Sequence, residues 1–129
     1  MYQVKRNRIV EDLELDDNGK KLTLHVDMGV DAILQRYTKA ARVVAAAQQE
    51  VRNAPDNETK VEKLGEAILK LFEVIFGADQ TNQILEFYDG AYLEMLTDIA
   101  PFINDVVAPK ITEAQQRIAG QYAAIKTRK

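Results

Sequence analysis

The chain opens with two runs in which apolar and polar residues alternate. These runs cover residues 9–15 and 20–26, and Asn18 and Gly19 lie between them. Alternation with a period of two is typical of strands with one buried face. Asn-Gly between two such runs is the strongest short signal for a two-residue type I′ turn. The pattern therefore predicts a β-hairpin.

The loop position sets the pairing of the two predicted strands. With Asn18-Gly19 as the loop, Leu13 faces Leu24 and Asp12 faces His25. The leucines then share one face, and the polar residues share the other. A lone hairpin is only marginally stable in water, so its leucine face needs a cover. We expect helices to supply it, or a further strand, from another copy of the chain or from residues 2–4.

Beyond Val26 the apolar positions recur every three or four residues, which predicts helices. The first helix runs to about Asn53, and Asp27 or Asp31 is expected to cap its start. The proline-containing segment 54–59 ends it, because proline cannot continue a helix.

A second amphipathic helix follows and is expected to end at Gly77, where a left-handed cap fits. Asp79 or Thr81 would then cap a short third helix, which Gly90 weakens or ends.

Two glycines fall inside predicted helices, Gly65 and Gly120. Each costs about 1 kcal/mol relative to alanine in a helix. A close crossing of two helices would explain such a cost. The sequence therefore predicts close crossings at both positions.

Helical spacing continues from Ala91 to the end of the chain, and Pro101 and Pro109 interrupt it. A proline either starts a helix or kinks it, so two bent helices are expected here. The last helix carries a narrow apolar stripe, which we take as a candidate interaction surface. This stripe consists of Ile111, Ile118, Tyr122 and Ile125. A packed terminal helix is the alternative interpretation, because a narrow seam serves either purpose.

These patterns predict an α+β fold, mostly α: an N-terminal β-hairpin followed by a bundle of about four to five helices with proline bends. The length of 129 residues indicates a single domain, 1–129. Within it we expect a β-hairpin region (1–27), a helical body (28–109) and a basic C-terminal helix (110–129).

The net charge of −3 hides a segregation of charge along the chain. Residues 1–10, 32–55 and 110–129 carry net charges of +3, +3 and +4, whereas residues 11–31 and 56–109 carry −5 and −8. Such blocks favour contact between copies or a partner of complementary charge. Ordinary solvated helix faces are the alternative interpretation.

The amino-acid composition excludes several kinds of functional site. With no Cys and one His, cysteine nucleophiles, disulfides and most metal sites are excluded, and no phosphate-binding glycine cluster is present. We therefore expect no catalytic residues, no cofactor and no metal, and we interpret His25 opposite Asp12 as a solvated strand residue. The acidic balance argues against nucleic-acid binding. The absence of an apolar run of about 20 residues, or of a signal peptide, predicts a cytoplasmic protein that makes no membrane contact.

One part of the chain resembles a known family. The stretch Phe76-Gly77-Ala78-Asp79-Gln80-Thr81-Asn82-Gln83-Ile84-Leu85-Glu86-Phe87-Tyr88, followed by residues 92–96 and 99–103, is similar to tail assembly chaperones of long-tailed (siphovirus) phages and prophages of Gram-positive bacteria. The likeness covers about residues 60–105 by pattern and the rest by layout.

This resemblance implies a non-enzymatic role in virion morphogenesis. A tail assembly chaperone coats the tape-measure protein before the tail tube forms, so the resemblance implies that protein as a partner and a homo-oligomer as the working form. A small structural virion protein, for tail completion or a connector, is the first alternative. A helical regulatory or nucleic-acid-binding module is the second.

Overall fold

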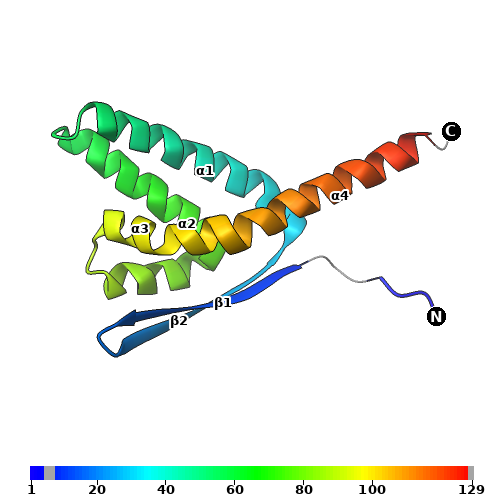
Figure 1. The fold of residues 1–129 in the computed structure, drawn as a ribbon, viewed down its shortest axis with the longest axis horizontal. Coiled ribbons are helices and arrows are strands. Elements are labelled where there is room, and N and C mark those ends of the chain that lie inside the picture. Colours follow the sequence, from blue (N-terminus) through cyan, green and yellow to red (C-terminus); the bar gives the residue numbers. More distant parts are fainter. Residues whose placement is uncertain (5–7, 128–129) are drawn as a thin grey trace.

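The fold is a β-hairpin followed by helices (Figure 1). A computed structural model describes residues 1–4 and 8–127, with side chains as far as Gly120. The strands are β1 (Arg8–Asp17) and β2 (Lys20–Gly29). The helical elements are α1 (Val30–Asn53), α2 (Glu58–Phe87), α3 (Tyr92–Phe102), the π-helical turn η1 (Ile103–Val107) and α4 (Ala108–Thr127). The predicted class, α+β and mostly α, is confirmed.

The hairpin has the predicted turn and register. Asn18 and Gly19 both have positive φ, 52° and 92°, as a type I′ turn requires. Leu13 pairs with Leu24, and Asp12 pairs with His25. The hairpin extends beyond the expected limits, since β2 continues to Gly29.

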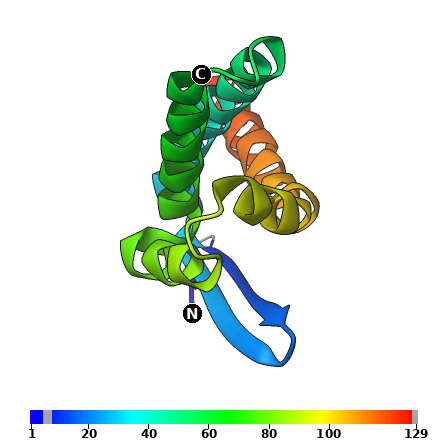
Figure 2. The same cartoon turned by 90° about the vertical axis from the view of Figure 1, so that its left-hand side faces the viewer.

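Helices, and not a third strand, cover the leucine face of the hairpin. Leu24 and Val26 are fully buried, and β2 packs against α2. Figure 2 shows the helices on one side of the hairpin. The alternative of a strand from residues 2–4 is wrong, because the described residues 1–4 form no strand and Tyr2 is 92% exposed.

Helix α1 begins without the expected carboxylate cap. Gly29 takes the N-cap position, where it has no side chain to accept a hydrogen bond from the first turn. Asp27 lies in β2 and accepts a 2.8 Å hydrogen bond from Arg8, while Asp31 lies in the first helical turn. The end of the helix at Asn53 is as predicted.

Helix α2 is kinked at Gly77. Its backbone there has φ 82° and ψ 165°, a conformation that glycine adopts readily because it has no Cβ. The chain resumes helical geometry at once, so the expected third helix is the second part of α2, and the Thr81 hydroxyl donates to the Gly77 carbonyl (2.8 Å). A turn with positive φ at Asp89 and Gly90 follows its end.

The prolines do not divide the last helix as expected. Elements α3, η1 and α4 form one helical run from Tyr92 to Thr127. The Ala108 N–H reaches back to the Ile103 carbonyl, which widens the turn just before Pro109. A wider turn leaves room for a proline ring against the preceding carbonyls. The described residues thus contain three continuous helical runs, and the expected four to five was too many.

The core lies where the hairpin, α2 and the last helical run meet. Its largest fully buried side chains include Phe72, Ile75 and Met95. A Cβ on Gly65 would lie 2.8 Å from Cδ2 of Tyr92, so the predicted close crossing is confirmed there. At Gly120 no atom lies within 4 Å of that position, and the second predicted crossing is wrong.

Candidate interaction surface

An open groove lies between α1 and α4. Its volume is about 790 Å³. Apolar side chains from both helices contribute to it, and polar and basic side chains complete the lining. The lining residues are Leu34, Gln35, Thr38, Lys39, Arg42, Gln115, Ile118 and Ala119. We call this feature the α1–α4 groove.

The helical period explains which residues of α1 line this groove. Ile33 and Val44 are buried in the core. Leu34, Thr38 and Arg42 follow at spacings of four residues, and such spacing puts side chains on one face of a helix. The face runs from a partly buried leucine to exposed polar residues. The α1–α4 groove is therefore apolar near the core and basic farther along α1.

A second groove, of about 560 Å³, lies on α1 and α2. Arg36, Lys39 and Lys70 give it a basic lining, and Glu73 adds one carboxylate. Val43, which is 47% exposed, also lines it. Lys39 belongs to both grooves, so the exposed side of α1 presents basic side chains along its length.

The structure divides the stripe proposed from sequence. Ile111 is 2% exposed and packs in the core of its own chain, which removes it from an interaction surface. Ile118 is 40% exposed and lines the α1–α4 groove. Tyr122 and Ile125 lie outside the residues whose side chains are described. Ile118 is therefore the residue of this stripe that the structure places on a groove.

Sequence reasoning missed the α1 side of this groove. The helical pattern puts Leu34 among the apolar positions of the first helix, and it does not single out Thr38, Lys39 or Arg42. The sequence pattern contained one indication of the groove. An apolar position next to a row of basic residues marks the edge of the buried stripe of a helix. Which helix lies beside that edge depends on tertiary packing.

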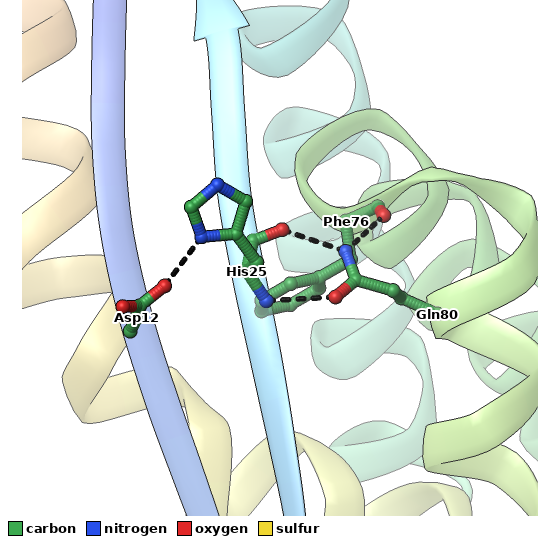
Figure 3. A network of polar contacts seen from close by, with 4 residues as sticks. All are labelled: Asp12, His25, Phe76 and Gln80. Atoms are coloured by element: carbon green, nitrogen blue, oxygen red, sulfur yellow. Dashed lines mark hydrogen bonds and ion pairs between the residues drawn. The ribbon is translucent and has the colours of Figure 1, made fainter.

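A polar network ties the middle of β2 to α2 (Figure 3). The His25 backbone N–H donates to Oε1 of Gln80, and Nε2 of Gln80 donates to the His25 carbonyl, both at 2.7 Å. Nε2 of Gln80 also donates to the Phe76 carbonyl at 2.8 Å. The amide thus occupies this part of the outer edge of β2.

The His25 ring lies on the solvated face of the hairpin, as its alternation predicts. Nδ1 of His25 contacts Oδ1 of Asp12 on β1. This hydrogen bond, with the negative charges of Asp12 and Asp27, raises the pKa of His25 above its ordinary value. Both partners are exposed, with 57% and 70% of their side chains accessible. The pair is a surface ion pair when the ring is protonated.

Carboxylates gather where the hairpin turn meets α3. A cavity of about 220 Å³ there is lined by Asp16, Asp17, Phe87, Tyr88, Asp89, Glu94 and Asp98. The Tyr88 hydroxyl donates to Oδ2 of Asp98 at 3.0 Å. Burial, this hydrogen bond and the surrounding negative charges raise the pKa of Tyr88 above its ordinary value. Tyr88 therefore stays protonated at neutral pH.

Two findings limit the chemistry of the described part of the chain. No group of three or more His, Asp or Glu side chains is placed to hold a metal ion among residues 1–4 and 8–127. No helix in the same residues has an apolar stretch long enough to cross a bilayer. The two grooves on α1 are lined mainly by apolar and basic side chains.

Comparison with known proteins adds no further constraint. No protein family, curated protein or solved structure matches this chain.

Proposed function

We propose that this protein is a non-enzymatic tail assembly chaperone of a phage, which acts in the host cytoplasm as a homo-oligomer. In this proposal the α1–α4 groove binds a helical segment of the tape-measure protein. The resemblance of residues 60–105 supports the phage assignment. The observation that carries the binding proposal is the groove itself, with apolar and basic side chains along one open surface.

The groove has the chemistry that an amphipathic helix needs. Such a helix lays apolar side chains, spaced three or four residues apart, into an apolar groove. Leu34, Ile118 and Ala119 supply apolar contacts from two helices. Lys39 and Arg42 at the same groove favour a partner with carboxylates beside its apolar stripe, because complementary charges guide encounter and orientation.

Co-expression of the full chain with the tape-measure protein of the same phage tests this proposal. We expect affinity capture of either protein to recover the other, and the complex to keep the tape-measure protein in solution. Ile118→Asp places a charge on the groove and should weaken the complex by about tenfold or more, which corresponds to about 1.4 kcal/mol. Because Ile118 is 40% exposed, this variant should fold.

Leu93→Asp is the matched control, because Leu93 is a 52% exposed apolar residue of α3 that does not line the groove. It should bind as the unchanged chain does. Equal binding by Ile118→Asp and the unchanged chain would contradict the groove assignment. No complex under any condition would contradict the chaperone proposal.

The two alternative functions give different results. A structural virion protein would be present in purified phage particles, whereas an assembly chaperone would be absent from them. A nucleic-acid-binding module would use the basic side chains of α1, such as Arg36 and Arg42, and would be retained on DNA at low salt. Retention that falls as salt rises would favour that module.

A further inference from the structure

The two outer edges of the hairpin differ. In an antiparallel pair, the backbone N–H and C=O groups of alternate residues point away from the partner strand. The bonds between Gln80 and the backbone of His25 show that His25 points outward from β2. Asp12, its partner, then points outward from β1, and so do Val10 and Glu14. Among the described hydrogen bonds, none occupies these groups of β1.

The exposed edge of β1 is a surface that another strand can join. Unpaired edge groups are a template for pairing with another chain. Val10 is 52% exposed, and the side chains of Asp12 and Glu14 are 70% and 53% exposed. Lys110 of α4 forms an ion pair with Glu11, whose side chain lies on the opposite face of β1. The edge of β2, by contrast, is occupied at its middle by Gln80.

We propose that the β1 edge pairs with the β1 edge of a second copy, antiparallel and with the two-fold axis at Val10. The two hairpins then form one four-stranded sheet in the order β2, β1, β1, β2. The surface is isologous, because each copy contributes the same strand. This pairing gives a contact for the homo-oligomer that the proposed function includes, and in that respect the pairing rests on the proposed function.

Charge selects this register over those with Arg8, Asp12 or Glu14 at the axis. With Val10 at the axis, Arg8 of each copy lies opposite Asp12 of the other, and opposite charges across a pair stabilise a sheet. With Asp12 at the axis, two Asp12 carboxylates would face each other, and with Glu14 at the axis two glutamates would do so. With Arg8 at the axis, two guanidinium groups would meet. Like charges directly opposite destabilise a sheet.

The register also uses the exposed apolar residue of this edge. Val10 lies on the polar face of the hairpin, between Arg8 and Asp12. At the axis it would meet Val10 of the other copy, which covers both side chains. The basic residue at the start of this strand and the acidic residues in its middle therefore make it complementary to a second, antiparallel copy of itself.

Light scattering of the full chain, without any partner, tests the pairing. We expect a dimer at micromolar concentration. Val10→Pro removes an outward N–H that makes no bond within the hairpin, and edge strands tolerate proline at such positions. It should raise the dissociation constant at least about tenfold. Thr23→Pro is the matched control, because it removes an outward N–H from β2 and should leave the dimer intact.

Charge reversal gives a second test, which does not depend on proline. Arg8→Glu and Asp12→Arg should each be monomeric, because each places like charges opposite one another at both pairs. Mixed together, they should form a heterodimer in which both pairs are again of opposite charge. Circular dichroism checks that each variant is folded.

A monomeric unchanged chain at micromolar concentration, a dimeric Val10→Pro variant, or a mixture of reversed variants that stays monomeric would each overturn the pairing. A failure of the groove proposal can be distinguished from a failure of the pairing. Ile118→Asp should keep the dimer and lose the tape-measure protein, whereas Val10→Pro should lose the dimer in the absence of that protein.

Discussion

The side-chain amide of Gln80 takes the place of a neighbouring strand at His25. Its oxygen accepts from the His25 N–H and its nitrogen donates to the His25 carbonyl, each at 2.7 Å, across 55 residues of sequence. An amide is suited to this position because it presents one acceptor and two donors. The second donor binds the Phe76 carbonyl, which ties the hairpin to α2 near its kink.

Gln80→Leu should destabilise the protein, because it removes these bonds and leaves the His25 backbone groups to water. Each hydrogen bond makes a net contribution of about 1 kcal/mol to stability, so we expect a loss of about 1–2 kcal/mol in the free energy of unfolding. Urea denaturation followed by circular dichroism measures it. Gln83→Leu, an exposed change on the same helix, should have little effect. Equal losses in the two variants would contradict a specific role for Gln80.

The His25–Asp12 pair should make stability depend on pH. The pKa of His25 is raised in the folded protein, mainly by the hydrogen bond to Asp12. The contribution to stability is therefore fully present below the unfolded pKa of about 6.5 and is lost as pH rises through the folded value. Relative to His25→Gln, the unchanged chain should be more stable at a pH below about 6.5, where the ring is protonated, than in alkaline solution, where it is neutral.

Nuclear magnetic resonance titration of the His25 ring checks the cause. Asp12→Asn should bring the pKa of His25 down toward about 6.5. A pKa that does not change in this variant would contradict the assigned partner.

Gly65→Ala should be destabilising in the unchanged chain and stabilising when Tyr92 is also changed to alanine. The new Cβ would lie 2.8 Å from the Tyr92 ring, and overpacking of this kind costs about 1–3 kcal/mol. Without the ring, the helix propensity of alanine should add about 1 kcal/mol. Thermal unfolding of the four chains measures the coupling. If the effect of Gly65→Ala is the same in both backgrounds, the close crossing does not limit this position.

Two isoleucines seven residues apart should respond differently to truncation. Ile111→Ala opens space in the core and should cost about 2–5 kcal/mol, whereas Ile118→Ala on the groove should cost less than about 1 kcal/mol. Chemical denaturation of both variants measures the difference. Similar losses would show that Ile118 also packs in the core.

The hairpin could be predicted in detail from the sequence because its determinants are local. Asn18 and Gly19 set the turn, and the alternation then leaves a single register that puts Leu13 and Leu24 on one face. The helices were predicted less well. A proline interrupts a helix by rule, but the π-helical turn before Pro109 depends on how the surrounding residues pack.

The candidate site was predicted only in part, because the repeat does not show where along α4 the core ends. A seven-residue repeat drifts by only about 20° per repeat, so Ile111 and Ile118 lie on nearly the same side of the helix. Ile111 packs in the core, whereas Ile118 lies one repeat farther along, where α4 extends away from the other elements (Figure 1), and it lines the α1–α4 groove. The α1 side of the groove and the bonds of Gln80 join segments far apart in sequence, and no local pattern encodes such contacts.

Hydrogen exchange of the full chain, alone and in complex with the tape-measure protein, tests whether the α1–α4 groove binds that protein. We predict that the partner slows exchange along the groove, in residues 34–42 of α1 and around Ile118 of α4, while the start of α3 around Leu93 exchanges as before. A complex that protects the start of α3 and leaves the α1–α4 groove unchanged would contradict binding in this groove.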